Sequence, residues 1–266
     1  MTVDFPTNTV IILTLAITVF TAGAWVGLSV AIRRSPIAPQ AKRRWRWGAG
    51  IVLLTLLLAR WVLAQSSTVL GLAFVIPFAV VSLLAGILPL LLSPVFRQIV
   101  RSIPATWLYG LQAIRVFGGF YWLALADMKL LAPQFALSAG YADIVAGVLA
   151  PVMIYLLSTR KPFARALVIA WNVFGLLDFV NGYTTTFVFN ARFIAQLAAS
   201  GTSVHYMNYT AFISAFVVPL LIVLHIYSLF QLLGPRADEM KQRVKGAAGD
   251  PVFGENNAPS ILKVHD

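Results

Sequence analysis

The sequence predicts an all-α membrane protein: a polytopic bundle of about seven transmembrane helices, with the N-terminus outside and the C-terminus in the cytoplasm. The chain of 266 residues is 59% hydrophobic and only 11% charged, whereas a soluble domain carries about 25% charged residues. Several apolar runs approach the roughly 20 residues that a helix needs to cross a bilayer. These runs are continuous rather than alternating, which argues against a transmembrane β-barrel.

The charge and the cysteine count exclude several classes of protein. The formal net charge is +11, but the basic residues lie in loops between apolar runs, where they act as topology signals and contacts for anionic lipid. No basic domain stands apart from the spans, so we expect no nucleic-acid partner. The absence of cysteine excludes disulfides, thiolate metal sites and cysteine catalysis. The expected partner is the lipid bilayer, with anionic lipid at the basic cytoplasmic loops; the oligomeric state stays open.

The first span is predicted at Val10–Ile32. It is not a cleaved signal peptide, because the residues before it contain no Lys or Arg and the apolar run continues to Arg33. A strongly basic segment, 33–46, follows and ends at Trp45 and Trp47, as expected of a cytoplasmic loop with interfacial tryptophans. A dedicated site for a lipid headgroup is the alternative for this segment.

The next spans are predicted at Gly48–Ala64, Val69–Leu92 and Ala105–Ala126. Pro77 and Pro89 lie inside the third span, where they predict kinks. Residues 93–104 are too few to span, but Arg97 and Arg101 share one helical face opposite apolar residues, which predicts a helix lying at the inner interface. The connection 127–140 is either a loop or a re-entrant segment.

The chain is predicted to form two regions. Residues 1–233 form a transmembrane bundle, and residues 234–266 form a largely disordered cytoplasmic tail. The longer connection 187–207 is expected to begin with a short amphipathic helix. We place the last three spans at Tyr141–Leu157, Pro162–Thr185 and Asn208–Leu233.

The distribution of lysine and arginine predicts the orientation. With seven spans, 16 of the 20 basic residues fall on one side and three, Arg60, Lys129 and Arg192, on the other. Basic residues are concentrated in cytoplasmic loops. This bias therefore places the C-terminus inside, and a missed or extra span would divide the basic loops between the two sides.

Charged and polar residues inside the predicted spans mark the candidate site, because such residues are costly at membrane depth and usually functional. At about 1.5 Å per residue, Arg115, Asp143, Asp178 and His225 fall within one layer about 10 Å thick in a hydrocarbon core about 30 Å thick. By helical spacing, Gln112 lies on the same face as Arg115, and Asn181 lies on the same face as Asp178 and Trp171. We predict a ligand-binding site formed by Gln112, Arg115, Asp143, Asp178, Asn181 and His225.

Arginine stays protonated, so Arg115 needs an anionic partner or water. We expect it to contact Asp143 or Asp178, with Gln112 and Asn181 as hydrogen-bonding neighbours. One arginine facing two carboxylates leaves one carboxylate spare, which can hold a proton, a cation or a basic substrate. We also expect Asp143 in the first turns of its helix, where the helix dipole favours a negative charge.

Plainer roles remain open for each of these residues. Arginine–aspartate pairs also occur as static ties between helices. Asp143 can be an interfacial cap together with Ser138, and His225 a structural hydrogen-bond donor.

Several familiar sites are absent from the sequence. A retinal Schiff base needs a lysine inside the bundle, and no predicted span has one; paired haem ligands need two membrane histidines, and only His225 qualifies. There is no HExxH motif, no phosphate-binding loop and no G-x-S-x-G. We therefore expect no metal, no cofactor and no catalytic residue.

Three segments together carry a resemblance: Gln112-x-x-Arg115-x-x-Gly118, then Pro133-x-Phe135-Ala136-x-x-Ala139-Gly140-x-x-Asp143, then Trp171-Asn172-x-x-Gly175-x-x-Asp178. This pattern covers about 70 residues and resembles uncharacterised bacterial multi-spanning membrane proteins. The resemblance implies that these positions form one unit and a location in a bacterial inner membrane, but no activity. Seven spans are similar to microbial rhodopsins and seven-helix receptors in number alone.

The leading hypothesis for function is a membrane protein that handles a small solute, an ion or a proton, as a transporter or a sensor, through the Arg/Asp site. An alternative is a membrane-embedded enzyme acting on a lipid or isoprenoid, with Asp178 or His225 in acid–base roles. Enzymes of that kind usually need a metal or paired-carboxylate motif on a cytoplasmic loop, and the loops here are almost only basic. The other alternative is a structural or assembly subunit, in which the polar layer only holds the helices together.

Overall fold

The computed structural model describes residues 7–65, 72–159, 161–199 and 207–234. Helices account for nearly all of these residues and no β-strand occurs among them, which confirms the all-α class. The chain divides into two compact units, one ending at Leu232 and one beginning at Leu233. The first unit contains the helix bundle, and the predicted tail lies outside the described residues beyond Gly234.

Three long helices begin the chain: α1 (Thr7–Arg34), α2 (Pro39–Gln65) and α3 (Leu72–Leu92). α2 begins well before the predicted second span, so much of the basic segment is helical rather than a loop. The turn between α1 and α2 is closed by Lys42, whose Nζ donates to the carbonyl oxygen of Arg33 at 2.8 Å. A carbonyl in the last turn of α1 thereby gains a cationic donor.

The short amphipathic helix predicted within 93–104 is present as α4 (Pro94–Arg101). Its N-cap is Ser93, whose Oγ accepts from the backbone N–H of Phe96 at 3.1 Å, and Pro94 follows at the first helical position, where its missing N–H costs nothing. Phe96, Ile99 and Val100 are buried. The helix therefore packs its apolar face into the bundle, as the spacing indicates.

The predicted fourth span is built from three consecutive pieces. α5 (Ala105–Gly110) passes into a 3₁₀ turn, η1 (Leu111–Ile114), and then into α6 (Arg115–Asp127). A 3₁₀ stretch in the middle of a longer helix often marks a functional hinge. Here it ends directly before Arg115.

The start of the predicted fifth span was wrong. α7 runs from Pro133 to Ser158, so it begins eight residues before Tyr141, and the connection after α6 is a short turn with Lys129 at φ 57°. Proline at the first helical position, after extended Ala132, explains the earlier start. Most of the segment 127–140 is thus neither a loop nor re-entrant: it is the first part of a long helix.

Two π-helical turns interrupt the last long helices. α8 (Pro162–Thr185) continues through η2 (Thr186–Asn190) into α9 (Ala191–Ala199), the expected helix of the 187–207 connection. α10 (Met207–Phe212) continues through η3 (Ile213–Val217) into α11 (Val218–Leu233). Pro219, the second residue of α11, has no N–H for the regular ladder, which accounts for the irregular turn before it.

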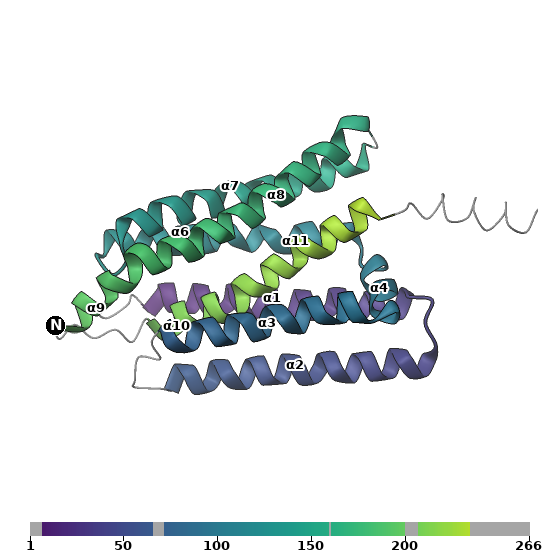
Figure 1. Cartoon of the computed structure of the whole chain (residues 1–266), viewed down its shortest axis with the longest axis horizontal. Coiled ribbons are helices and arrows are strands. Elements are labelled where there is room, and N and C mark those ends of the chain that lie inside the picture. Colours follow the sequence, from purple (N-terminus) through teal and green to yellow (C-terminus); the bar gives the residue numbers. More distant parts are fainter. Residues whose placement is uncertain (1–6, 66–71, 160, 200–206, 235–266) are drawn as a thin grey trace, which may run out of the picture. The chain divides into compact units, whose positions relative to one another are not determined.

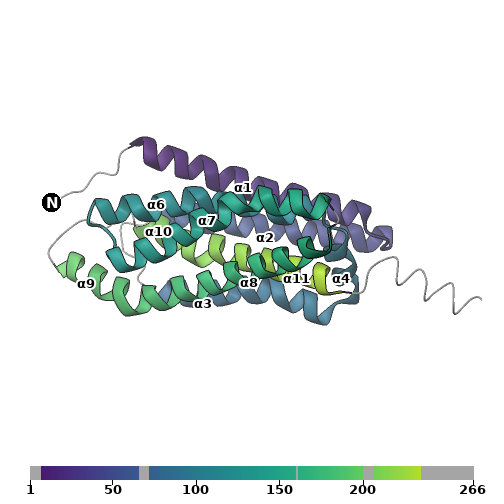
Figure 2. The ribbon, with the colours of Figure 1, turned by 90° about the horizontal axis from the view of Figure 1, so that it is seen from above.

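Helices α6, α7 and α8 pack side by side (Figures 1 and 2). Glycines make this packing close. A Cβ atom on Gly119 of α6 would lie 2.4 Å from the carbonyl oxygen of Gly140 on α7, and one on Gly147 would lie 2.7 Å from the backbone nitrogen of Val116. Small residues at such crossings let two backbones approach within reach of each other's side chains.

Five of the helical segments are long and apolar enough to cross a membrane: Thr14–Arg34, Val75–Leu92, Pro133–Ser158, Phe163–Gln196 and Thr210–Leu233. Their outward faces are apolar, with Val81, Leu91 and Leu177 each more than 60% exposed. In contrast, the charged residues Arg115 and Asp178 are buried. An apolar exterior around a charged interior is the arrangement of an integral membrane protein. The number of spans and their orientation stay predictions; α2 and the α5–η1–α6 segment cover the other two predicted spans.

Candidate functional site

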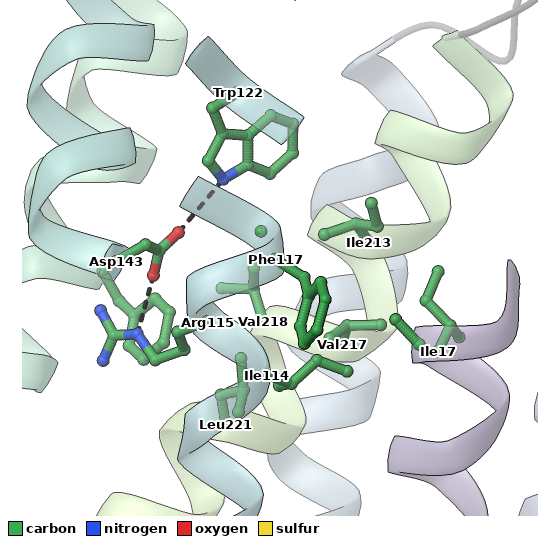
Figure 3. A pocket seen from close by; sticks show the side chains of 13 residues that line it. Ile17, Ile114, Arg115, Phe117, Trp122, Asp143, Ile213, Val217, Val218 and Leu221 are labelled. Carbon is green, nitrogen blue, oxygen red and sulfur yellow. Dashed lines mark hydrogen bonds and ion pairs between the residues drawn. The ribbon is translucent and has the colours of Figure 1, made fainter. Parts of the chain in front are cut away.

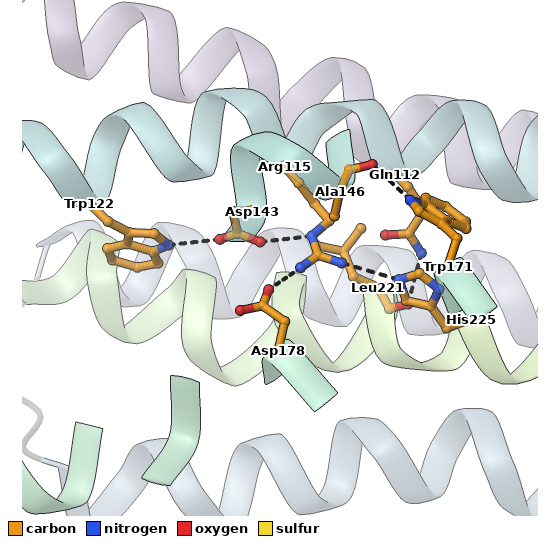
Figure 4. A network of polar contacts seen from close by, with 9 residues as sticks. All are labelled: Gln112, Arg115, Trp122, Asp143, Ala146, Trp171, Asp178, Leu221 and His225. Atoms are coloured by element: carbon orange, nitrogen blue, oxygen red, sulfur yellow. Dashed lines mark hydrogen bonds and ion pairs between the residues drawn. The ribbon is translucent and has the colours of Figure 1, made fainter. Parts of the chain in front are cut away.

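The centre of the site is Arg115, whose side chain is completely buried. It is the first residue of α6, directly after the 3₁₀ turn. In apolar surroundings a guanidinium must find acceptors within the protein. The network around it (Figure 4) supplies acceptors from three other helices.

Both predicted carboxylates contact Arg115. Its Nε–H donates to Oδ1 of Asp143 on α7 at 2.7 Å, and its Nη2 donates to Oδ2 of Asp178 on α8. The close approach of α6 and α7 at Gly119 brings the first pair together. The layer predicted from helical depth is therefore a single connected cluster.

His225 of α11 accepts the third hydrogen bond. Its Nε2 lies 3.2 Å from Nη1 of Arg115, and its Nδ1 lies 2.9 Å from Oδ1 of Asn172 on α8. Arginine can only donate, so Nε2 is the acceptor and the proton of the neutral ring is on Nδ1. The amide nitrogen of Asn172 donates to the carbonyl oxygen of Val168 at 2.7 Å, which leaves Oδ1 facing the histidine.

Aromatic side chains enclose the charged groups. The ring centroid of Phe179 lies 4.3 Å from Cζ of Arg115, a cation–π contact. Trp122 donates from Nε1 to Oδ2 of Asp143 at 3.1 Å, and the ring of Trp171 lies 5.0 Å from that of His225. These rings exclude water from the ion pairs while adding one more donor to Asp143.

Two buried oxygen atoms at the site have no hydrogen-bond partner. Both oxygens of Asp143 accept an N–H, but Oδ1 of Asp178 is buried and has no hydrogen-bond partner. Oε1 of Gln112 is in the same situation. A buried polar atom without a partner is rare and calls for an explanation.

The structure places the predicted residues unequally. Gln112 is buried, but its Nε2 donates to the carbonyl oxygen of Leu221 at 3.0 Å rather than joining the ion pairs. Asn181 is exposed on α8 and does not belong to the cluster. The inward face of α8 follows Asn172, Gly175 and Phe179, at intervals of three and four residues, and Asn181 lies off this stripe.

The position expected for Asp143 within its helix was also wrong. Because α7 begins at Pro133, Asp143 lies well beyond the first turns, outside the reach of the helix-dipole term. Ser138 does not cap it either, since its Oγ donates to the carbonyl oxygen of Phe135 at 3.2 Å. The charge of Asp143 is balanced by Arg115 instead.

Sequence reasoning missed three contributors, Asn172, Trp122 and Phe179. Asn172 points about 120° away from Asp178 on a helical wheel, so the face that contains Asp178 does not include it. Asn172 lies on the inward stripe of α8, seven residues before Phe179, and the packing of the neighbouring helices defines that stripe. Residue type alone marks neither Trp122 nor Phe179.

A pocket reaches this network from the side of α1 (Figure 3). It is a small, partly open pocket, and nearly all of its lining is apolar. Asp143 and Arg115 lie on one side of it and Ile17 of α1 on the other. The side chain of Asp143 is 13% exposed, while those of Arg115 and Asp178 are 0% and 4% exposed.

Within the described residues, no group of three histidines or carboxylates is arranged to hold a metal ion. Asp143, Asp178 and His225 come near to one another, but each of them contacts the guanidinium of Arg115. The guanidinium of Arg115 thus occupies the centre of the cluster.

The fold and the site define an integral membrane helix bundle with a buried arginine–carboxylate network. Residues 70–233 match the model of a family described as a domain of unknown function, DUF8737, and the chain belongs to this family. The match includes every residue of the network. No curated protein and no solved structure matches the chain.

Proposed function

We propose that this protein handles a small solute, an ion or a proton, as a transporter or a sensor in a bacterial inner membrane, through the network of Arg115, Asp143, Asp178 and His225. The observation that carries the proposal is the unpartnered Oδ1 of Asp178. Two carboxylates share one arginine, and His225 is engaged as a neutral acceptor. A network built only to tie helices together does not need the second carboxylate.

The test uses purified protein in liposomes, with uptake of protons, Na⁺, K⁺ and methylammonium measured under an imposed membrane potential. We expect faster uptake of at least one of these cations than in empty liposomes, and a loss of at least tenfold in Asp178→Asn. Asp127→Asn is the matched control, because Asp127 is exposed at the end of α6. Uptake equal to that of empty liposomes for all four, with no change in the thermal stability of the protein in their presence, would contradict the proposal.

A structural or assembly role is the second candidate. It is favoured by the complete burial of the Arg115 side chain, which keeps the guanidinium out of contact with water. Under this role the Asp178→Asn variant would leave uptake unchanged and alter only the stability of the bundle.

The enzyme alternative has weaker support. The lining of the pocket is mainly apolar, which is the chemistry that a lipid or isoprenoid ligand would contact. However, both oxygens of the carboxylate that borders it, Asp143, are occupied by Arg115 and Trp122. Neither oxygen is therefore free to act as a general acid or base on a ligand in the pocket.

A further inference from the structure

We propose that Asp178 is a proton-binding site and that the proton is held on its Oδ1 while Asp143 is ionised. This inference rests on the proposed function and names the proton as the species that the site handles. It concerns which of two neighbouring carboxyl groups holds the proton.

The first step is the charge of the cluster. The guanidinium of Arg115 carries one positive charge, and two ionised carboxylates would carry two negative charges. His225 adds none, since its Nδ1–H faces Asn172 and its Nε2 accepts from Arg115. No other lysine or arginine contacts these groups within the described residues. An uncompensated buried charge is strongly unfavourable, so one proton makes the cluster neutral.

The second step is the choice between the two carboxyl groups. Asp143 receives an N–H on each oxygen, from Arg115 at 2.7 Å and from Trp122 at 3.1 Å. Hydrogen bonds from N–H donors stabilise the ionised form. Asp178 receives a hydrogen bond on Oδ2 alone, and its Oδ1 has none. The proton is therefore held on Oδ1, where no donor opposes it.

The third step is the set of charged and titratable groups that face Asp178. These are Arg115 from α6, Asp143 from α7 and His225 from α11, linked through one guanidinium. Loss of the proton leaves one negative charge in the cluster. That charge favours either return of a proton or entry of a cation, which is how proton binding at Asp178 would be coupled to a conformational change or to a co-transported ion.

The test is infrared spectroscopy of the purified protein at pH 7, reading the C=O stretch of protonated carboxyl groups and its shift in D₂O. We expect a band in the wild type that is absent from Asp178→Asn, and that changes frequency in Asp178→Glu but not in Asp143→Glu, because both glutamate variants keep two carboxyl groups beside the one guanidinium. Exposed carboxyl groups are ionised at pH 7, so they do not contribute. Asp127→Asn is the control that must keep the band at the wild-type frequency, because Asp127 is exposed and lies outside the cluster.

A wild type without the band, a band that survives in Asp178→Asn, or a band that changes frequency in Asp143→Glu but not in Asp178→Glu would overturn the assignment. The outcome is separable from that of the proposed function. If the band is assigned to Asp178 but no cation is taken up, the proton site stands and the transport function is rejected. If a cation is taken up but the band is absent, transport stands and the proton site is rejected.

Discussion

At the scale of single residues, Arg115 is held by a set of neutral and charged acceptors rather than by one ion pair. Its three nitrogen positions face Asp143, His225 and Asp178, and the Phe179 ring covers one face of the guanidinium. If one of these side chains is removed, its former partners stay in the apolar interior without their counter-charge or hydrogen bond. The cost of a single substitution is thus dominated by the charge that is left behind.

Replacement of Arg115 by alanine tests this dependence. Arg115→Ala leaves an ionised Asp143 without its main donor, and we expect a loss of about 3–5 kcal/mol in stability, seen as a low yield of folded protein in detergent. Arg115→Ala combined with Asp143→Ala removes both charges and should restore part of the yield. Equal yields of the single and double variants would show that the two residues do not stabilise each other.

Gly175 tests the geometry around His225. A Cβ atom there would lie 2.4 Å from Nε2 of His225 and 3.0 Å from Nη1 of Arg115, whereas one on Gly182, also on α8, meets nothing within 4 Å. We expect Gly175→Ala to lower the midpoint of thermal unfolding by several degrees, because the histidine must move and lose its acceptor contact. Gly182→Ala should keep or raise stability by up to about 1 kcal/mol, since alanine favours helix. A Gly175→Ala variant as stable as Gly182→Ala would contradict the described packing.

The charged members of the network could be predicted from the sequence because Arg and Asp are rare inside apolar runs. Depth along each span was sufficient to bring Arg115, Asp143, Asp178 and His225 into one layer. Asn181 was misplaced because it lies only about 60° from Asp178 on a helical wheel, a difference that decides between the inside and the outside of the bundle. The face of α8 that points inward depends on the helices that pack against it, and a single sequence does not define this packing.

At the scale of the helices, the crossing of α6 and α7 controls whether the ion pair can form. Gly119 and Gly140 lie where the two backbones come closest. Asp143 is one turn beyond Gly140, and Arg115 one turn before Gly119, so this contact sets the distance between the two side chains.

Adjacent glycines on α6 offer a matched comparison. We expect Gly119→Ala to cost about 1–3 kcal/mol by overpacking, because its Cβ would meet the backbone oxygen of Gly140 at 2.4 Å. Gly118→Ala introduces the same methyl group at an ordinary contact distance, 3.7 Å from Oδ2 of Asp143, and should unfold at or above the wild-type temperature. Similar losses in both variants, measured by thermal unfolding in one detergent, would exclude the close crossing as the cause.

The basic residues of α2 and α4 lead to a prediction about lipid. The ring of Trp45 lies 4.9 Å from that of Phe96, so the start of α2 packs on α4, and the sequence between Asp4 and Asp127 contains no Asp or Glu. We propose that anionic headgroups neutralise this surface. Phosphatidylglycerol in place of phosphatidylcholine should raise the unfolding temperature in nanodiscs, and added salt should weaken the effect.

A triple substitution, Lys42, Arg43 and Arg44 to Gln, should remove much of the response to phosphatidylglycerol, at about 1 kcal/mol per basic residue near the surface. Arg192→Gln on α9 is the control and should retain it. An unchanged response in the triple variant would assign the effect to another part of the protein.

The helices themselves were predictable to the extent that composition and breakers define them. Apolar runs and flanking charges located every long helix, and the spacing of Arg97 and Arg101 located α4. The ends of the helices were predicted less accurately than their centres. Pro133 was treated as part of a connection, although proline is common at the first position of a helix. The π turns in η2 and η3 have no signal in residue type apart from Pro219.

At the scale of the whole unit, the basic segments gather at one end of the bundle, as the seven-span arrangement requires. α4 meets the start of α2 through Trp45 and Phe96, and it meets the end of α11 through Gln231, whose Nε2 donates to the carbonyl oxygens of Val100 and Ile103 at 2.6 and 2.9 Å. The start of α8 reaches the same place, since Arg165 donates to the carbonyl oxygen of Leu232. The short turn after α6 meets Asn190 of η2, and both views place α9 at the end away from α4 (Figures 1 and 2).

The orientation of this bundle in the membrane is the remaining prediction. Sixteen basic residues belong to the segments at the α4 end or follow α11, and only Arg60, Lys129 and Arg192 belong to the other side. Basic loops are retained in the cytoplasm, so reporter fusions at Lys42, Pro162 and Gly246 should all give a cytoplasmic signal, and a fusion at Met128 should give a periplasmic one. The fusion at Met128 distinguishes a correct orientation from a reporter that is never exported. A periplasmic signal at any of the first three positions would contradict seven spans with the N-terminus outside, because the three lie in different connections that this topology places on one side.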